Sequence, residues 1–444
     1  MAELQAQVVV VGAGPGGLAA ARAAARNGAT VTLVDAAPAA GGQIWRARRG
    51  VLADEVAHGL RELEAHDARV LTATRVAMPL PGRGLLVEGP DGAHRLRWQR
   101  LILATGARER LLPFPGWTLP GVFGAGGLQA LVKGGWPIAG KRVVVGGTGP
   151  LLLAAAATLR AEGAHVVALA EEATTRTLAA FSGSLLRHPR KGLEALRLAR
   201  RLRGVPMHFG ARVVAAEGGG RVERVVLQTA AGARTIACDA LAAGWGLVPQ
   251  TELAEAIGCV LAPRFGARAI AVGAAQDTSV PGVYAIGECT GVAGVRAAVL
   301  AGDAAGTAAA RALRGLAAAA DGGRALTREL RFAADVAQTF PVSPGWRERV
   351  AGDTLVCRCE DVRWDALRDE PDLRSAKLST RCGMGHCQGR LCHDALAHMM
   401  GADRLPARPP ALPIRLGALL AIGSDGGAGT VSNHDLAPPQ ETSR

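Results

Sequence analysis

Residues 7–17 read Gln-Val-Val-Val-Val-Gly-Ala-Gly-Pro-Gly-Gly and lead directly into an alanine-rich stretch. The run of valines is typical of a strand buried on both faces of a parallel sheet, and the turn after it has the spacing Gly-x-Gly-x-x-Gly. Gly12 permits a tight bend, Gly14 lets the backbone approach a pyrophosphate, and Gly17 lets the next helix pack on the strand. The start of that helix offers free N–H groups and a positive dipole, so the stretch predicts a dinucleotide-binding unit.

A second apolar strand is expected at residues 29–34, after the helix, and it leads to Asp35. In dinucleotide-binding folds, an acid at this place accepts hydrogen bonds from the hydroxyls of the adenosine ribose. A lone glycine motif is weak evidence, but here strand, glycines, helix, strand and acid follow one another in the order that the fold requires. We therefore prefer a dinucleotide site to a glycine-rich turn with a purely structural role.

Residues 142–150, Arg-Val-Val-Val-Gly-Gly-Thr-Gly-Pro, repeat this pattern and precede an apolar helix and a strand that runs to Glu171. With Gly147 and Gly149 as the first two glycines, the third position holds Leu152. A leucine there should hold the helix away from the strand and spoil the close packing of a dinucleotide site. Three interpretations of this second fold stay open: an NAD(P) site, a site for another nucleotide such as ATP, or a fold that binds nothing. Its candidate contacts are Gly147, Gly149 and Glu171.

The composition is that of a large folded protein with an unusual charge. The chain has 444 residues, 49% of them hydrophobic and 20% charged, which excludes wholesale disorder and predicts about three domains. Its formal charge of +13 first suggests nucleic acid, but only 3% of the residues are aromatic, so base-stacking side chains are scarce and we expect no nucleic-acid partner. The main basic concentration, residues 187–203, has leucines at helical spacing and indicates an amphipathic helix with a solvated face. Docking of an acidic partner or a nucleotide on that face stays open.

Five of the eight cysteines lie between residues 357 and 392, a clustering that in a reducing compartment points to metal rather than to disulfides. Cys357 and Cys359 form a Cys-x-Cys pair, and Cys387 and Cys392 form a Cys-x4-Cys pair, so two loops supply four thiolates. Interleaved glycines let backbone N–H groups approach cluster sulfides; they are Gly383, Gly385 and Gly389. Zinc sites prefer two to four residues between paired cysteines, so we predict a [2Fe–2S] cluster and keep zinc as the alternative.

Two further strands that run into glycine-containing turns indicate the wider fold. Residues 101–108 read Leu-Ile-Leu-Ala-Thr-Gly-Ala-Arg, and residues 281–291 read Pro-Gly-Val-Tyr-Ala-Ile-Gly-Glu-Cys-Thr-Gly. With the two glycine turns, they resemble the flavoprotein family that includes thioredoxin-reductase-like and glutathione-reductase-like enzymes. The resemblance covers residues 7–315 and implies an α/β fold in which a nucleotide-type domain is inserted into an FAD-binding domain.

In that family the acid before the last helix holds the ribityl chain of the flavin, which implies this role for Glu288; an ordinary helix-capping acid is the alternative. The FAD contacts that the resemblance implies are Gly12, Gly14, Pro15, Gly17, Asp35, Gly42, Gln43, Val76, Thr105, Gly106, Gly287 and Glu288. The disulfide-reducing members carry a Cys-x-x-Cys pair, which the first 350 residues here lack. Cys289 alone indicates a buried packing thiol, and no set of catalytic residues stands out.

The cysteine-rich segment resembles the ferredoxin-like (BFD-type) [2Fe–2S] domain that is fused to several flavoproteins. Its pattern is Cys-x-Cys-Glu followed by Thr-Arg-x-Gly-Met-Gly-x-Cys-Gln-Gly-x-x-Cys. The ligands that this pattern implies are Cys357, Cys359, Cys387 and Cys392. Cys382 is left without a place, although it could replace Cys387 after a small shift of the loop.

Longer stretches narrow the resemblance further. They begin at Leu112 (Leu-Pro-Phe-Pro-Gly-Trp-Thr-Leu-Pro-Gly-Val), Gly244 (Gly-Trp-Gly-Leu-Val-Pro-Gln-Thr-Glu-Leu) and Phe340 (Phe-Pro-Val-Ser-Pro-Gly). With the cluster motif, they resemble the FAD/[2Fe–2S] alpha subunits of bacterial heteromeric amino- and imino-acid dehydrogenases. This family includes opine oxidase, hydrogen cyanide synthase and D-hydroxyproline or proline dehydrogenase.

The resemblance implies an electron-transfer subunit of a hetero-oligomer, beside an FAD-containing beta subunit that oxidises the substrate. It leaves open the presence of FMN at a subunit interface and of a small ferredoxin-like [2Fe–2S] gamma subunit. A self-contained NAD(P)H-dependent FAD/iron–sulfur oxidoreductase is the alternative. The sequence predicts neither a membrane span nor a cleavable leader, so we expect a cytoplasmic protein; contact with the inner membrane through the electron acceptor stays open.

We expect four parts in the chain. Residues 1–117 and 245–335 form the FAD-binding domain, and residues 118–244 form the inserted nucleotide-type domain. Residues 350–400 form the [2Fe–2S] domain, and residues 401–444 form a proline-rich tail that is disordered from Ser424 onward.

Overall fold

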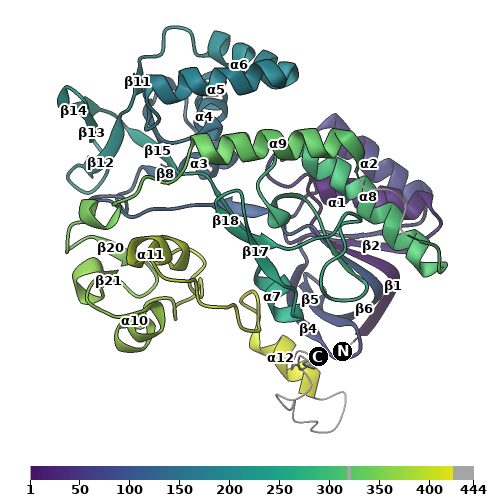
Figure 1. The fold of residues 1–444 in the computed structure, drawn as a ribbon. Coiled ribbons are helices and arrows are strands. Elements are labelled where there is room, and N and C mark those ends of the chain that lie inside the picture. Colours follow the sequence, from purple (N-terminus) through teal and green to yellow (C-terminus); the bar gives the residue numbers. More distant parts are fainter. Residues whose placement is uncertain (1, 318–321, 424–444) are drawn as a thin grey trace, which may run out of the picture.

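The computed structural model describes residues 2–317 and 322–423, so the predicted disorder from Ser424 onward lies outside the described residues. Within them the chain forms two α/β units, joined by two short strands, and a cysteine-containing module that packs beside them (Figure 1).

The first unit is built on a seven-stranded sheet with the order β3-β2-β1-β6-β5-β4 and with β19 beside β6. Its strands are β1 (Ala2–Val11), β2 (Val31–Val34), β3 (Arg69–Leu71), β4 (Arg75–Leu80), β5 (Gly84–Gly89), β6 (Gly92–Leu103) and β19 (Val283–Ala285). β1 pairs in parallel with β2 and β6. Val8 and Val10 pack on one face of the sheet, and Val9 and Val11 pack on the other, which explains the uninterrupted valines of this strand.

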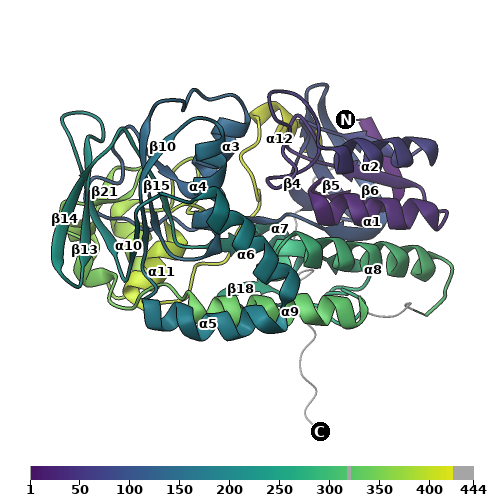
Figure 2. The same cartoon turned by 90° about the horizontal axis from the view of Figure 1, so that it is seen from above.

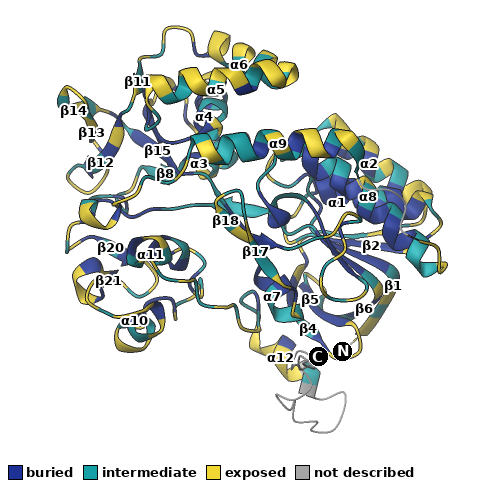
Figure 3. Ribbon diagram, viewed as in Figure 1, coloured by how far each residue is buried: buried dark blue, intermediate teal, exposed yellow. Residues whose placement is uncertain are grey.

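Helices α1 (Pro15–Arg26) and α8 (Val295–Leu313) pack against each other on this sheet, and α2 (Asp54–Ala65) lies beside them (Figures 1 and 3). The contact between α1 and α8 leaves no room for a side chain at two glycines of α8. A Cβ at Gly302 would lie 2.3 Å from the Gly16 carbonyl oxygen, and a Cβ at Gly306 would lie 2.2 Å from that of Ala20. The glycine and alanine content of these helices therefore serves the close approach of two backbones.

The second unit contains a five-stranded sheet with the order β11-β10-β9-β15-β8 and a three-stranded antiparallel sheet, β12-β13-β14. The strands are β8 (Val122–Gly124), β9 (Arg142–Gly147), β10 (His165–Glu171), β11 (Met207–Phe209), β12 (Arg212–Glu217), β13 (Arg224–Thr229), β14 (Gly232–Ala237) and β15 (Ala240–Gly244). The helices are α3 (Ala125–Lys133), α4 (Pro150–Ala161), α5 (Thr175–Arg187) and α6 (Pro189–Arg201). β9, β10 and β15 run in parallel, as in the first unit.

Two strands carry the chain between the units, namely β7 (Ala107–Glu109) and β16 (Leu247–Pro249), which pair antiparallel. After β16 the chain returns to the first unit through α7 (Glu252–Ile257), β17 (Leu261–Arg264), β18 (Ala267–Ile270) and the 3-10 turn η1 (Gly287–Thr290). Helix α9 (Gly323–Thr339) then runs along α5 (Figure 2). Phe181 of α5 contacts Phe332 within α9 and Phe340 directly after it.

The cysteine-containing module consists of η2 (Arg347–Arg349), β20 (Leu355–Cys357), β21 (Val362–Arg363), η3 (Trp364–Ala366), α10 (Leu373–Thr380) and α11 (His393–Met400). Its core continues into that of the second unit, where Trp245 and Trp346 meet edge to face at 5.0 Å. Trp117 Nε1 also donates to the Leu355 carbonyl at 2.6 Å. The described part of the tail lies along the first unit, where Ala411 N donates to the Ala77 carbonyl, and ends in α12 (Leu416–Gly423).

The basic concentration of the sequence lies almost wholly in α6, which begins at Pro189, two residues after the end of α5 at Arg187. No residue of α6 is buried, whereas Leu202, just after it, is fully buried (Figure 3). Among the described residues, no helix has both the length and the apolar character needed to cross a membrane.

Candidate functional site

The first glycine turn is shaped by contacts that only glycine allows. Gly12 has a φ of +108°, and a Cβ there would lie 2.2 Å from the Ala104 carbonyl oxygen. A Cβ at Gly17 would lie 1.7 Å from the Gly12 carbonyl oxygen. The start of α1 is therefore held directly against β1 and the end of β6, as the motif predicts.

A second glycine pair lies over this turn. Gly41 N donates to the Ala13 carbonyl at 2.8 Å, and a Cβ at Gly42 would lie 2.9 Å from the Cα of Gly14 and 3.7 Å from Pro15. Two backbones thus approach each other where a pyrophosphate and the adjoining flavin are predicted. The next residue, Gln43, receives hydrogen bonds from Arg46 at its side-chain oxygen.

Asp35 stands at the end of β2, as predicted, and its carboxylate is bonded to the backbone. Oδ2 accepts from Ala13 N at 2.5 Å and Oδ1 accepts from Ala37 N at 2.7 Å. Each oxygen keeps a second lone pair, so the carboxylate can hold the turn and accept from a ribose hydroxyl. Thr74 N donates to the Asp35 carbonyl, and this contact brings the start of β4, with the buried Val76, beside the turn.

At the end of β6, Thr105 and Gly106 are clamped to Gln250. Thr105 Oγ1 donates to the Gln250 carbonyl at 2.7 Å, and Gln250 Nε2 donates to the Thr105 carbonyl at 2.9 Å. Gln250 N also donates to the Gly106 carbonyl at 2.9 Å. These contacts fix the strand end on which the resemblance places the flavin, at the point where the chain leaves for the second unit.

Glu288 carries an unsatisfied buried oxygen. Gly287, with a φ of +71°, starts η1, and Glu288 Oε1 accepts from Gly294 N at the start of α8 at 2.9 Å. Oε2 is buried and has no hydrogen-bond partner in the part of the chain that the structure describes. Burial raises the pKa of Glu288 to about 7, against the single backbone bond that lowers it. A hydroxyl of a ribityl chain would satisfy this oxygen, so the residues fit a flavin.

The neighbouring Cys289 is fully buried. Its Sγ donates to the Ile286 carbonyl at 3.1 Å, and burial raises the pKa of the thiol. Such a thiol stays protonated and behaves as a packing group.

The second glycine turn is closed by its own acid. Gly147, with a φ of +136°, would place a Cβ 1.8 Å from the Gly244 carbonyl oxygen. Glu171 Oε1 accepts from Thr148 Oγ1 at 2.8 Å and from Ala173 N at 2.9 Å, and Oε2 accepts from Gly149 N at 2.9 Å. Burial raises the pKa of this carboxyl, and its three bonds serve the turn itself.

Leu152 and Phe340 complete the surroundings of this turn. Leu152 is buried, and its Cδ2 lies 3.5 Å from the place of a Cβ on Gly244 of β15. On the open side, Phe340 at the end of α9 lies 3.8 Å from the place of a Cβ on Gly149. The turn thus has Leu152 on the side of β15 and Phe340 beside Gly149.

A cavity of about 730 Å³ extends from this turn towards α8. Thr148 and Gly149 line one part, Val292–Gly294 line another, and α9 contributes Phe332 and Phe340. The cysteine-containing module adds His398. The second turn, the start of α8 and the module therefore face one space.

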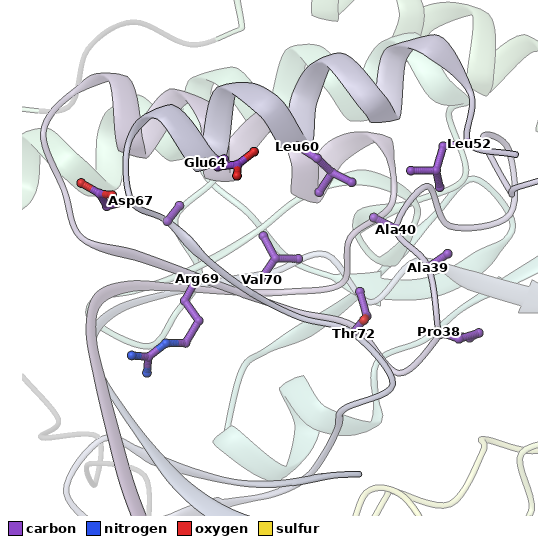
Figure 4. Close-up of a pocket in the computed structure, with 11 residues that line it drawn as sticks. Pro38, Ala39, Ala40, Leu52, Leu60, Glu64, Asp67, Arg69, Val70 and Thr72 are labelled. Atoms are coloured by element: carbon purple, nitrogen blue, oxygen red, sulfur yellow. The ribbon is translucent and has the colours of Figure 1, made fainter. Parts of the chain in front are cut away.

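Another cavity, of about 720 Å³, lies between α2, β3 and the loop after β2 (Figure 4). Its charged lining side chains are Glu64, Asp67 and Arg69, and Leu52 and Leu60 line it with apolar surface. None of the site residues that the sequence predicts lines this cavity.

The module brings two of the four predicted metal ligands together with Cys382. The Sγ atoms of Cys357, Cys382 and Cys392 are buried and lie within 4.8 Å of one another. Cys387 is half-buried and Cys359 is exposed. Hydrogen bonding from Cys392 lowers the pKa of Cys387 to about 5, and bonds from Cys382 and Cys392 lower the pKa of Cys357 strongly. Cys382, which the pattern leaves without a place, is thus a close neighbour of two predicted ligands.

His393 is a residue of this centre that the sequence analysis missed. A Cβ on Gly383 would lie 2.1 Å from its ring, and one on Gly389 would lie 2.3 Å from it, so these glycines make room for an imidazole. Nε2 is buried without a hydrogen-bond partner among the described residues, and burial lowers the pKa of His393 to about 4. The signal in the sequence was the histidine directly after the last cysteine.

Comparisons of the sequence with known proteins identify a family and several relatives. The sequence profile of the pyridine nucleotide-disulphide oxidoreductase family matches residues 6–316. The HcnB subunit of hydrogen cyanide synthase from Pseudomonas protegens is 32% identical over 86% of this chain and 89% of its own length. An opine oxidase subunit from Rhizobium meliloti is 33% identical over 92% of this chain and 97% of its own length.

Solved structures show the same fold. L-proline dehydrogenase from P. horikoshii superposes with a TM-score of 0.67, at 19% identity, over 94% of this chain and 80% of that one. Thioredoxin reductase from T. acidophilum superposes with a TM-score of 0.54, at 26% identity, over 70% of this chain and all of that one. These comparisons confirm the resemblance, and the protein belongs to the pyridine nucleotide-disulphide oxidoreductase family, as a relative of the HcnB subunit of hydrogen cyanide synthase and of the corresponding opine oxidase subunit.

Proposed function

We propose that this chain is the FAD- and [2Fe–2S]-containing electron-transfer subunit of a heteromeric dehydrogenase that acts on an amino or imino acid of the D-amino acid, opine or hydroxyproline type. The observation that carries the proposal is a cluster of buried thiols, Cys357, Cys382 and Cys392, in a module packed against an FAD-type oxidoreductase fold. Such a pair of centres converts two-electron oxidation into single-electron transfer.

In this proposal the chain's own residues hold the flavin in an ordered way. The turn of Gly12–Gly17 faces the pyrophosphate, Asp35 faces the adenosine ribose and Val76 the adenine. Glu288 Oε2 would accept from a ribityl hydroxyl, and Gly42, Gln43, Thr105 and Gly106 would hold the isoalloxazine. The flavin, when bound, would supply the redox chemistry.

For the cluster we propose the ligands Cys357, Cys359, Cys387 and Cys392. The donor set fits, because thiolates are the ligands of such clusters and two of the four sulfurs, those of Cys357 and Cys392, lie within 4.8 Å of each other. Cys382 lies close enough to take part. A neutral His393 beside these thiolates can donate one hydrogen bond without adding a charge.

The partner in this proposal is an FAD-containing beta subunit that oxidises the substrate. Support comes from the relatives, which are themselves named as subunits of hydrogen cyanide synthase and of opine oxidase. The alpha subunit of sarcosine oxidase from Corynebacterium is a more distant relative, 33% identical over 39% of this chain. A ferredoxin-like gamma subunit, together with FMN at a subunit interface, belongs to the same proposal.

The alternative is loading of the flavin by NAD(P)H through the second turn. The cavity that joins Gly149 to Gly294 favours it. Two contacts oppose it: Phe340 lies over Gly149, and Glu171 already binds the Gly149 N–H group that a phosphate would need.

Purification of the chain tests both functions. We expect one FAD and about two iron atoms per chain, and no bleaching of the flavin on anaerobic mixing with NADH or NADPH. Zinc in place of iron, or a protein without flavin, contradicts the proposal. Prompt bleaching by either nucleotide supports the alternative.

A further inference from the structure

Two arginines, Arg108 in the linking strand β7 and Arg110 directly after it, reach the cysteine-containing module. Arg108 Nε donates to the Arg390 carbonyl at 2.9 Å, and Arg110 Nε donates to Asp394 Oδ2 at 2.7 Å. Both side chains therefore point towards the module. Arg390 stands between Cys387 and Cys392, and Asp394 stands in the first turn of α11.

Arg108 also lies next to the predicted flavin contacts. It follows Gly106 by two residues, and it is paired with Val248 of β16. Gln250, the residue directly after β16, holds Thr105 and Gly106 through three hydrogen bonds. The backbone from the flavin end of β6 to Arg108 is therefore fixed on both sides.

A buried carboxylate aims the Arg108 side chain. Glu252 Oε1 accepts from Arg108 Nη1 at 2.7 Å and from Arg404 Nη1 at 3.2 Å, and the side chains of Arg108 and Glu252 are only 15% and 11% exposed. Burial acts to raise the pKa of Glu252, but the two guanidinium groups outweigh it, so the carboxylate stays charged. The planar guanidinium thus binds the cluster loop through Nε and the carboxylate through Nη1, two donors at a fixed spacing, whereas a lysine offers a single nitrogen in their place.

We propose, on the basis of the function proposed above, that Arg108 is the positioning residue that couples the flavin to the cluster. It fixes the cluster loop at the Arg390 carbonyl relative to the strand end at Gly106, and its charge favours the reduced, more negative cluster. The coupled step is the transfer of one electron from reduced FAD to the oxidised cluster, in which one ferric ion becomes ferrous. The proton that the flavin loses goes to solvent.

The variants Arg108→Ala and Arg108→Lys test this role in the full chain with both centres bound. A laser flash reduces the flavin with electrons from a sacrificial donor added to the solution, and the absorbance of the cluster is then followed over time. We expect Arg108→Ala to slow electron transfer at least about tenfold and to shift the cluster potential to a more negative value. We expect Arg108→Lys to restore the potential but not the rate, because it keeps the charge and loses one of two bonds. Arg142→Gln, which breaks an exposed pair with Asp239 in the second unit, is the matched control.

The outcomes separate the two proposals. A wild-type protein without iron or flavin refutes the proposed function. Full occupancy of both centres with an unchanged rate and potential in Arg108→Ala refutes only the role of Arg108. If Arg108→Ala loses its cluster, Arg108→Lys decides: a wild-type rate in that variant overturns the inference, and a slowed rate with a wild-type potential supports it.

Discussion

The two glycine turns start from nearly the same sequence and end in different surroundings. Around Gly12 the neighbours are the backbone of Gly41, Gly42 and the end of β6, together with the Asp35 carboxylate, and an oxygen of Glu288 lacks a partner among the described residues. Around Gly149 a carboxylate with three hydrogen bonds and an aromatic ring fill the space. Glycines shape both turns, but Glu288 keeps a free buried oxygen for a ligand, whereas both oxygens of Glu171 are bonded to the second turn itself.

This difference shows how a binding fold can serve as a support. Glu171 provides from inside the protein the acceptor oxygens that a phosphate would bring from outside. Phe340 packs with Phe181 at 5.4 Å and so ties α9 to α5 across the turn. The contacts of the second turn thus join parts of the molecule, and four experiments sharpen or break this comparison.

The largest effect is expected from Gly17→Ala in the first turn. The new Cβ would lie 1.7 Å from the Gly12 carbonyl oxygen, a backbone atom that cannot move away. We expect a loss of at least about 3 kcal/mol in the free energy of unfolding and loss of FAD, measured by denaturant unfolding and flavin absorbance. Gly183→Ala in α5, where no atom lies within 4 Å of the new Cβ, is the control and should be neutral or stabilising. A Gly17→Ala protein with full flavin contradicts the structure of this turn.

The next effect is a pH dependence that comes from Glu288. Its carboxyl has a pKa of about 7 in the folded chain and of about 4.5 when unfolded, so the folded state binds more protons between these values. The free energy of unfolding of the FAD-free protein should therefore fall by about 3 kcal/mol as pH rises through this window. Glu288→Gln should remove this fall, and bound FAD should reduce it, because a hydroxyl that donates to Oε2 favours the charged form. Equal pH profiles for Glu288→Gln and wild type would contradict the buried, unpartnered oxygen.

A smaller effect is expected from Glu171→Ala in the second turn. The change leaves Thr148, Gly149 and Ala173 without their acceptor and should cost about 2 kcal/mol, measured by urea unfolding. Flavin content per folded molecule should stay at the wild-type value, in contrast to Glu288→Ala, which should weaken FAD binding about tenfold. Loss of flavin from Glu171→Ala would mean that Glu171, like Glu288, contributes to FAD binding, contrary to the difference in their hydrogen bonds.

Local patterns predicted the parts of the fold that neighbouring residues determine. The glycine turns, the strand-end acids Asp35 and Glu171, and the gathering of cysteines follow from spacing, because each depends on a short segment with one backbone geometry. The place of Phe340 over Gly149 and the approach of Cys382 to Cys357 depend on packing between distant segments, which periodicity does not encode.

The same limit applies to the arginines. Arg108 and Arg404 share Glu252 although they are nearly 300 residues apart, and nothing in the sequence distinguishes them from the many solvated arginines of this basic chain. His393 was missed for another reason: its role is visible only in Gly383 and Gly389, which the sequence analysis had assigned to the cluster sulfides.

The smallest effect is expected from Phe340→Ala, which uncovers the second turn. The ring is half-buried, so its loss should cost only about 1 kcal/mol in the free energy of unfolding. NADH should still fail to bleach the flavin, because Glu171 continues to occupy the Gly149 N–H group after the ring is gone. Anaerobic mixing of the variant with NADH measures this directly. Bleaching in Phe340→Ala but not in wild type would mean that Phe340 alone closes a working nicotinamide site. The second turn would then be a closed copy of the first, and its acid would be no obstacle to a nucleotide.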